Sequence, residues 1–485
     1  MKFLIYALLF VSCCLSAADI EVKFNHKTTH PAQQGDLERM VISAIESSKT
    51  SIDVAVYDLD LPNIATSLAK AHKAGKTVRL ITDSENTSGE NKEAFAILNK
   101  AKVPWIDDTE DGTSGTGIMH HKYIVVDGKF VVFGSANFTQ SCMHGDIKDG
   151  ILVSEGNVNH LVTLKSKQAA SVFLSDFNQM WGDGPGKKKD SKFGTGKKPH
   201  EIVAVVTDNE KIALNIQFSP WPSSAFGKEV TTLENMADFV STGEKRILFA
   251  QFAYSAQNVG DAAYARFKKG VDVRGVGDSN FFNQYWSEFL DMTGRSVKSP
   301  YQGKDNGIQG QEIDGKTRIP NRVWSPAAEA YVDNLIYDPE NGIEDKFHHK
   351  FVVVDDSVLT GSHNISSAGA FTNDEVMVII HDDAVADQFA AEFEGWFCSF
   401  KYKKDCVKNQ VAGSWEGVQF DDDSAEIALD IANNYSFDQL DEFLDSRAAR
   451  NIVEARPIMS LESLSQVQYV GPKALEKFKE LATAE

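Results

Sequence analysis

Two segments of the sequence combine histidine and lysine in the same order. Residues 120–127 read HHKYIVVD and residues 348–355 read HHKFVVVD, so both follow the pattern H-x-K-x-x-x-x-D. A Gly-Ser-x-Asn segment follows each of them, at residues 134–137 and 361–364. Imidazole can attack phosphorus or donate a proton, and ammonium and amide groups can bind phosphate oxygens. The two copies therefore predict a site for phosphodiester chemistry.

Each residue type has a part in such a reaction. One histidine would attack phosphorus, the other would protonate the leaving oxygen, and water would then release the phosphohistidine. Lysine and asparagine side chains would surround the non-bridging oxygens, where negative charge develops. This chemistry requires no metal, and no Cys/His cluster in the sequence has the spacing of zinc ligands. We therefore expect neither a metal nor another cofactor.

The motifs read as strands. In each motif the first histidine and the lysine are two residues apart, so their side chains share one face of a strand. The β-branched run after each lysine predicts that the strand is buried. The second histidine of each motif, His121 or His349, falls on the opposite face, where we expect it to pack rather than to react.

An internal repeat places both motifs in equivalent positions. Residues 52–83 and 247–278 align without a gap and share, among other positions, Gly75 and Gly270. Each copy reads as an apolar strand, a helix with a glycine cap, and a second strand that ends in aspartate. Such a unit is a βαβ unit with parallel strands in a sheet covered by helices. The predicted fold class is therefore α/β, with two related modules.

On these motifs, the sequence resembles the phospholipase D superfamily over about residues 35–405. The resemblance implies two pseudo-symmetric αβ modules whose motifs meet in one cleft. It implies that one of His120 and His348 is the nucleophile and the other the general acid, and the usual order in two-motif members assigns the attack to His120. The residues that the resemblance assigns to phosphate binding are Lys122, Lys350, Asn137 and Asn364, with Ser135 and Ser362 alongside.

The resemblance also assigns roles to acidic residues. Family members carry an acidic residue beyond the Gly-Ser-x-Asn segment that orients the histidine. Glu375 matches this position, and Asp149 matches it with a shorter side chain. The aspartates that end the two motifs, Asp127 and Asp355, are expected to be structural, because strand geometry places them away from the cleft.

The first residues have the pattern of an export signal. Lys2 precedes the apolar run 3–11, and small residues follow, so we expect a signal peptide over residues 1–18. The apolar run is too short to span a bilayer. The mature protein would be secreted or periplasmic, and lipid anchoring at Cys13 is a less favoured alternative. Export would permit a disulfide between Cys398 and Cys406, which the sequence does not decide.

The rest of the chain divides into four parts. We expect modules at residues 19–183 and 201–420, joined by a Lys/Gly-rich segment, 184–200, that reads as a flexible linker or, less favoured, as a phosphate-attracting lip. The tail, 421–485, resembles helix-hairpin-helix modules at residues 467–475, although only one of the usual hairpin glycines is present. Residues 444–456 look like a degenerate earlier copy of this hairpin, with Ser446 where glycine is usual. Because the tail carries 14 acidic and 6 basic side chains, we favour a helical cap that packs or contacts protein over nucleic-acid binding.

Composition restricts the substrate only in part. The chain has 485 residues, with 49 Lys and Arg against 69 Asp and Glu, and a net charge of -20. Such a body argues against a protein that coats nucleic acid through bulk charge, but it permits a local phosphate site. An apolar segment that contains Phe281, Phe282 and Trp286 reads as ordinary core or, less favoured, as a loop that could enter a lipid surface or stack against bases.

The favoured substrate is therefore a phospholipid, whose head group a phospholipase D would remove to yield phosphatidic acid. The alternative is an exported, metal-independent endonuclease that acts on DNA or RNA. Another phosphodiester reaction, including cardiolipin synthesis, is less favoured. No feature of the sequence indicates a stable protein partner, and we expect a monomer.

Overall fold

The computed structural model describes most of the chain. The described residues are 18–25, 36–112, 117–145, 147–148, 151–152, 154, 156–186, 188–225, 227–284, 286–293, 297–298, 305–306, 329–332, 337–338, 343–400, 413–415, 417–420, 422–455, 458 and 461–483. The expected signal peptide and Cys13 fall outside these ranges, apart from Ala18. Within the described ranges, no helix combines the length and the apolar character needed to cross a membrane.

The first module contains a seven-stranded sheet in the order β1-β9-β6-β5-β2-β3-β4. Its strands are β1 (Ile20–Phe24), β2 (Ser51–Val56), β3 (Thr77–Thr82), β4 (Trp105–Asp107), β5 (Lys122–Val126), β6 (Phe130–Gly134) and β9 (His160–Lys165). Its main helices are α1 (Leu37–Ser47), α2 (Pro62–Lys73), α3 (Lys92–Ala101) and α5 (Lys167–Trp181). The parallel pair β2 and β3 is joined by α2, so the repeat does form a βαβ unit.

The second module contains an eight-stranded sheet in the order β10-β11-β21-β20-β19-β12-β13-β16. Its strands are β10 (Val203–Val206), β11 (Ala213–Ser219), β12 (Arg246–Gln251), β13 (Asp272–Gly277), β16 (Glu329–Val332), β19 (Lys350–Val354), β20 (Ser357–Gly361) and β21 (Glu375–His381). Its main helices are α6 (Thr232–Ser241), α7 (Gln257–Phe267) and α11 (Asp383–Phe400). The parallel strands β12 and β13 are joined by α7, as in the first module.

Shorter elements connect these layers. They are α4 (Gln140–Met143), α8 (Ser279–Phe282), α9 (Glu288–Thr293), α10 (Ser367–Phe371), β7 (Ile147–Lys148), β8 (Ile151–Leu152), β14 (Val297–Lys298), β15 (Asp305–Asn306), β17 (Tyr337–Asp338) and β18 (Ile343–Glu344). The two glycines shared by the repeats occur for the same structural reason. Gly75 and Gly270 follow α2 and α7 with φ values of 86° and 85°, a left-handed conformation that favours glycine at a helix end.

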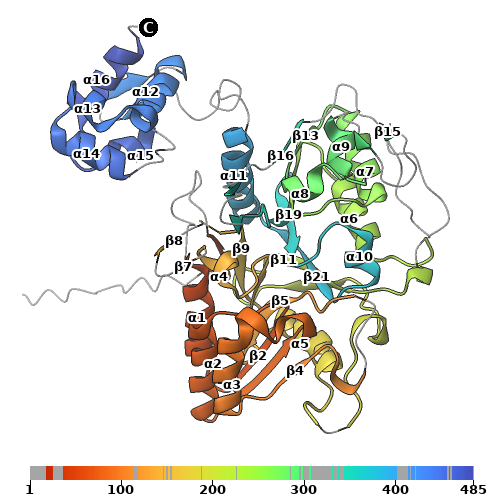
Figure 1. The fold of residues 1–485 in the computed structure, drawn as a ribbon. Coiled ribbons are helices and arrows are strands. Elements are labelled where there is room, and N and C mark those ends of the chain that lie inside the picture. The colour runs from red at the N-terminus through yellow and green to blue at the C-terminus, as the bar shows by residue number, and fades with distance from the viewer. Residues whose placement is uncertain are drawn as a thin grey trace, which may run out of the picture.

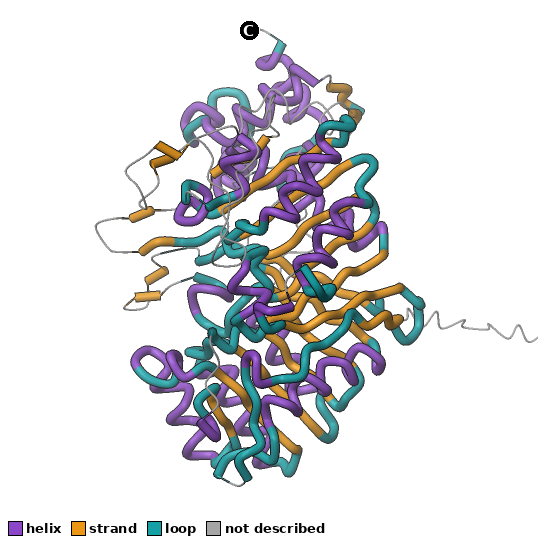
Figure 2. Tube along the Cα trace, turned by 90° about the vertical axis from the view of Figure 1, so that its right-hand side faces the viewer, coloured by secondary structure: helices purple, strands orange, loops and turns teal. Residues whose placement is uncertain are grey.

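The two modules share one hydrophobic core. It joins residues of both sheets with α5 and α11, including Tyr123 and Phe173 of the first module and Phe351 and Phe389 of the second. Two further cores lie on the outer faces of the sheets, one under α1 to α3 and one under α6 and α7. The modules stack along the long axis of the molecule in Figure 1, and Figure 2 shows the strands of both between layers of helix.

The segment between the modules differs from the flexible linker that its composition suggests. Phe193 is 1% exposed, and Lys197 is 5% exposed. The backbone NH of Lys192 donates to the carbonyl of Gln179, and that of Lys198 donates to the Gln179 side chain. The second half of the segment is therefore packed against α5, because its apolar and charged side chains find partners far away in sequence.

The tail forms a separate helical unit with its own core. Its elements are β22 (Gly413–Trp415), β23 (Val418–Phe420), α12 (Asp422–Asn434), α13 (Phe437–Asp441), α14 (Ser446–Glu454), α15 (Leu461–Ser465) and α16 (Pro472–Ala482). Val418 and Phe420 of the β-hairpin belong to the same core as Leu475 and Phe478 of α16. Short helices therefore lie on both sides of each expected hairpin turn (Figure 1).

Candidate active site

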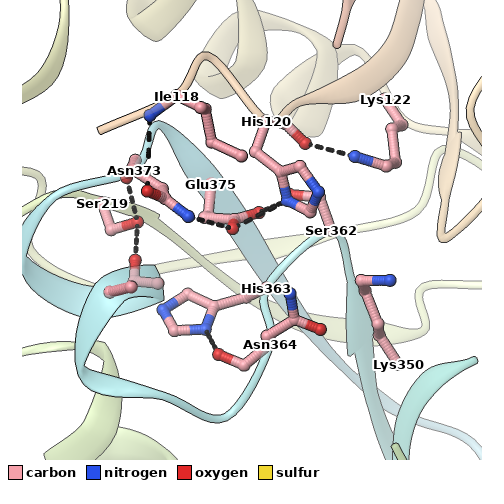
Figure 3. A network of polar contacts seen from close by, with 12 residues as sticks. Ile118, His120, Lys122, Ser219, Lys350, Ser362, His363, Asn364, Asn373 and Glu375 are labelled. Atoms are coloured by element: carbon pink, nitrogen blue, oxygen red, sulfur yellow. Dashed lines mark hydrogen bonds and ion pairs between the residues drawn. The ribbon is translucent and has the colours of Figure 1, made fainter. Parts of the chain in front are cut away.

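Both motifs reach the seam between the modules. Lys122 begins β5 and Lys350 begins β19, and both are central strands. Just before each motif, single bridges join the modules, with Met119 opposite Asp374 and Val158 opposite Phe347. Sequence-distant histidines and lysines are thus brought together. Figure 3 shows His120, Lys122 and Lys350 gathered around the strand that begins at Glu375.

His120 is held by a carboxylate from the other module. Its Nδ1 lies 2.8 and 2.9 Å from the two carboxylate oxygens of Glu375, which is fully buried. A carboxylate accepts this hydrogen bond, so Nδ1 carries the proton and Nε2 carries the lone pair. Burial, followed by the charges of Lys122 and Lys350, holds the pKa of His120 well below its usual value. A neutral imidazole with Nε2 unprotonated is the form that can attack phosphorus.

His348 has an amide in the equivalent place. Its Nδ1 lies 2.9 Å from Oδ1 of Asn159. Asn159 occupies the position in the first module that Glu375 occupies in the second, because the backbone NH of Ser135 bonds to the residue after Asn159 just as that of Ser362 bonds to the residue after Glu375. Asp149, the sequence candidate for this position, lies outside the described residues.

The two histidines also differ at their lysines. Both lysines donate to the backbone carbonyl of their histidine, over 2.7 Å for Lys122 and 3.2 Å for Lys350. The difference is that Lys350 Nζ also lies 3.1 Å from Nε2 of His348. Burial, then the charge of Lys350, holds the pKa of His348 well below its usual value. His120 therefore has a carboxylate at Nδ1 and no lysine at Nε2 among the described contacts. His348 has an amide at Nδ1 and a lysine at Nε2.

The two motif serines support the groups behind the histidines. The Ser135 hydroxyl donates to Oδ1 of Asn159 over 2.9 Å. Burial raises the pKa of Glu375, and a hydrogen bond from the Ser362 side chain acts in the opposite direction. Both serines are fully buried. Their contacts fit support of Asn159 and Glu375 better than direct binding of a phosphate.

The motif asparagines keep unused hydrogen-bonding capacity. The side-chain oxygens of Asn137 and Asn364 are buried and have no hydrogen-bond partner among the described residues. Figure 3 shows Asn364 below Glu375, with Lys350 to its right. A phosphate would accept from the amide NH₂ groups rather than bind these oxygens, so the unpaired oxygens leave the phosphate-binding role of both asparagines a prediction.

The last aspartate of each motif is tied to the backbone at the far end of its strand. Asp127 accepts hydrogen bonds from the backbone NH groups of residues 49–51, and Asp355 accepts them from those of residues 244–246. These bonds lower the pKa of Asp127 to about 2, although its partial burial acts in the opposite direction. Both residues have positive φ, 53° and 49°. The geometry is that of a structural clamp on the loop before β2 or β12.

The second histidines lie on the opposite face of their strands. Nε2 of His121 lies 3.0 Å from Asp176 of α5, and Nε2 of His349 lies 3.0 Å from Glu392 of α11. Both histidines are fully buried. They pack in the core between the modules rather than beside the catalytic pair.

Aromatic rings flank the two histidines at equivalent positions. Tyr57 follows β2 with its ring 5.2 Å from that of His120, and Phe252 follows β12 with its ring 4.8 Å from that of His348. On the His348 side, Phe281 continues from Phe252 at 4.5 Å, and Trp286 lies 5.8 Å further. We call Phe252, Phe281 and Trp286 the aromatic wall. Phe282 is instead fully buried in the core, so only part of the apolar segment can meet a substrate.

Sequence reasoning missed Asn159, Tyr57 and Phe252. The alignment of the two repeats contains a signal for Tyr57 and Phe252, because both follow the first repeated strand at the same offset. Asn159 had no such signal, since 24 residues separate it from Ser135, whereas Glu375 follows Ser362 more closely. Among the described residues, no group of three or more His, Cys, Asp or Glu side chains could hold a metal ion.

The lysines predict a pH dependence of anion binding. Burial lowers the pKa of Lys122 to about 8 and holds that of Lys350 well below its usual value. Each lysine is charged only below its pKa, so the affinity for sulfate should fall by about tenfold for each pH unit above 8. Titration calorimetry with sulfate, whose own charge is constant in this range, measures the effect. Lys122→Arg should flatten the profile, and an equally steep fall in that variant would contradict the assignment.

Known proteins and a family model match parts of the chain. A family model described as "Cardiolipin synthase, PLD-like domain" matches residues 41–181 and 236–396. A mitochondrial cardiolipin hydrolase from Mus musculus is 23% identical over 151 residues, which are 31% of this chain and 60% of that protein. A phospholipase D from Rickettsia prowazekii is 31% identical over 117 residues, 24% of this chain and 54% of that protein. The chain thus spans between about half and two thirds of the length of these relatives.

Solved structures include two with similar parts. NUC from Salmonella typhimurium, a phospholipase D family member, is 25% identical, with a TM-score of 0.27 over 34% of this chain and 95% of that chain. Phosphatidylserine synthase from Haemophilus influenzae is 11% identical, with a TM-score of 0.47 over 79% of this chain and 90% of that chain. The family model covers both modules and more than half of the chain, and the chain therefore belongs to the phospholipase D superfamily.

Proposed function

We propose that the protein is a phosphodiesterase that acts through a phosphohistidine. One observation carries the proposal: two buried His-Lys pairs from different modules meet at one seam, and each histidine is fixed at Nδ1 by a group from the opposite module. Because Nδ1 of each imidazole is fixed, Nε2 is the ring nitrogen that remains to react. Burial disfavours the charged forms of Lys122 and Lys350, and a bound anion would stabilise them.

In the proposed reaction, Nε2 of His120 attacks phosphorus and the bond from phosphorus to the leaving oxygen breaks. His348 donates its proton to that oxygen, and the negative charge of the bound phosphate favours the protonated form of His348. His348 then takes a proton from water, whose oxygen attacks phosphorus and breaks the bond to Nε2 of His120. Glu375 stabilises the positive charge on the phosphorylated imidazole. Lys122 and Lys350 bind the non-bridging oxygens.

The favoured substrate is a phospholipid, whose head group would be removed to leave phosphatidic acid. Two relatives are named as a cardiolipin hydrolase and a phospholipase D, and this supports a lipid phosphodiester. The aromatic wall beside His348 adds partly exposed apolar surface at the site. Together with the apolar run at residues 3–11, these features lead us to propose an exported enzyme that acts at a lipid surface.

The substrate is tested with the purified protein in the presence of EDTA. Phosphatidylcholine vesicles, cardiolipin vesicles, single-stranded DNA and double-stranded DNA are supplied in parallel. We expect head-group release from the vesicles, no cleavage of DNA and no effect of EDTA, because the site needs only protein groups. Loss of all activity in EDTA would reject the metal-free mechanism, and cleavage of DNA alone would reject the lipid substrate.

Nucleic acid is the second candidate, and one feature of the tail favours it. The two hairpins end at different helix caps. Gly471 caps α16 without a side chain, which leaves backbone NH groups available, whereas Asp445 caps α14 and pairs with Arg447. The first hairpin therefore presents a carboxylate where a DNA phosphate would bind. Only one hairpin is suited to a phosphate.

Deletion of residues 425–485 distinguishes the two roles of the tail. For a lipid substrate, we expect head-group release from vesicles to remain within about twofold of the intact protein, because the tail has a separate core. For a nucleic-acid substrate, the deletion would weaken DNA binding and flatten its salt dependence, since fewer phosphate contacts release fewer counterions. Salt-sensitive DNA binding that disappears with the tail, without vesicle activity, would overturn the lipid proposal.

A further inference from the structure

A buried ion-pair network lies behind His120, where the two modules meet. The ammonium of Lys197 lies 2.7 Å from Asp176 of α5 and 2.8 Å from Asp374, directly before β21. All three side chains are at most 3% exposed. Lys197 comes from the segment between the modules, so a single residue of that segment bridges an acidic residue of each module.

Each carboxylate of this network either belongs to or contacts a residue next to His120 or Glu375 in the sequence. Asp176 also contacts Nε2 of His121. His121 lies between His120 and the first residue of β5. Asp374 is the neighbour of Glu375, and its backbone carbonyl accepts a hydrogen bond of 3.0 Å from the NH of His120. Lys197 therefore connects the two chain segments that carry His120 and its carboxylate partner.

The backbone around Lys197 fixes its position. The NH of Gly194 donates to both carboxylate oxygens of Asp374, at 3.1 and 3.0 Å. Gly194 has a φ of 54°, and Phe193 before it is buried in the shared core. Lys197 reaches the network from an anchored turn rather than from a free chain.

The other half of the molecule has no such bridge among its described residues. Val158 occupies the position before Asn159 that Asp374 occupies before Glu375. His349 pairs with Glu392, which also accepts a hydrogen bond from Trp396 of the same helix. Among the described residues, the charged bridge therefore lies on the His120 side, which is the side with the carboxylate.

Lys197 favours the charged form of Asp374. Burial raises the pKa of Asp374, and the charge of Lys197 is the largest influence in the opposite direction. The same pair of carboxylates raises the pKa of Lys197 despite its burial. Without the ammonium, two buried carboxylates would lose their common partner, and the segments that they fix would shift.

We propose that Lys197 is a positioning residue that sets the hydrogen bond between His120 and Glu375 across the module boundary. The inference rests on the proposed function only for its effect on turnover, because the geometry of the pair exists without a substrate. A misplacement of about 1 Å is enough to lower turnover by about 100-fold. Lys197 touches neither the phosphate site nor the reacting atoms.

The test compares Lys197→Met with Lys198→Met, which replaces the exposed neighbouring lysine. The concentration of active sites is taken from the amount of phosphohistidine formed. We expect Lys197→Met to lower kcat per active site by about 10- to 100-fold. KM and the affinity for sulfate should change by less than about twofold, because Lys122 and Lys350 are untouched. Lys198→Met should match the unaltered protein. A kcat per active site that is unchanged in Lys197→Met would overturn the proposal.

A second readout needs no activity. The NMR resonance of the Nδ1 proton of His120 reports its bond to Glu375, and it should shift in Lys197→Met while that of His348 does not. If Lys197→Met does not fold, Lys197→Met combined with Asp374→Asn and Asp176→Asn removes the unpaired charges and should show the same shift. An unchanged His120 resonance would reject the positioning role. Inactivity of the unaltered protein on every phosphodiester, with the shift present, would reject the proposed function alone.

Discussion

Alanine at position 120 should abolish the phosphohistidine and lower turnover by about 10⁴-fold, and alanine at position 348 should lower turnover to a similar degree. The reason is that the two imidazoles act as one unit. Nε2 of His120 forms the bond to phosphorus, and no other described group with a lone pair is held beside Lys122 and Lys350 in the same way. The measurement is the single-turnover rate, combined with a search for acid-labile, base-stable label, as expected of a phosphohistidine, and with peptide mapping of that label.

The double variant provides the control for this prediction. His120→Ala combined with His348→Ala should lose little more than either single variant, because removing one member of a cooperating pair already removes the reaction. His381→Ala, at the far end of β21, should retain turnover. Label on His348 in the intact protein would reverse the two roles, and full turnover in His348→Ala would reject the site.

The parts of the fold with local sequence signals were predictable. The repeat predicted two βαβ units, since β-branched runs, helical spacing and the glycines at 75 and 270 all act over short distances. Strand alternation predicted that His121 and His349 lie on the opposite face from the reacting histidines. The family resemblance predicted that Glu375 orients a catalytic histidine without saying which, and its carboxylate lies 2.8 Å from Nδ1 of His120.

The parts that depend on distant partners were not predictable. The segment 184–200 has the composition of a solvated linker, and nothing nearby indicates that Lys197 would be buried. Its partners Asp176 and Asp374 lie in different modules, so the ion pairs exist only after both have folded. Asn159 was missed for a similar reason, because the strands β7 and β8 and their connections separate it from the motif.

The second large effect on the rate is expected at Glu375, which contacts Nδ1 of His120. Glu375→Gln should lower the rate of phosphohistidine formation by about 100- to 1000-fold. Phosphorylation places a positive charge on the imidazole of His120, and the buried carboxylate at 2.8 Å is the group that stabilises it. Glutamine keeps the size of the side chain and an oxygen that accepts from Nδ1, so the loss reports the charge rather than the shape. Rapid quench of the labelled intermediate measures this step.

Asn159→Asp is the matched change on the other side, and its effect should be of a different kind. A new carboxylate beside Nδ1 of His348 would raise the pKa of that histidine, because a negative charge favours the protonated imidazole. The general acid would then stay protonated to higher pH, and the alkaline limb of the plot of kcat against pH should shift to higher pH. Phosphohistidine formation at low pH should change little. If Asn159→Asp instead impaired label formation while Glu375→Gln left it intact, the carboxylate would belong to the general acid, and His348 would be the nucleophile.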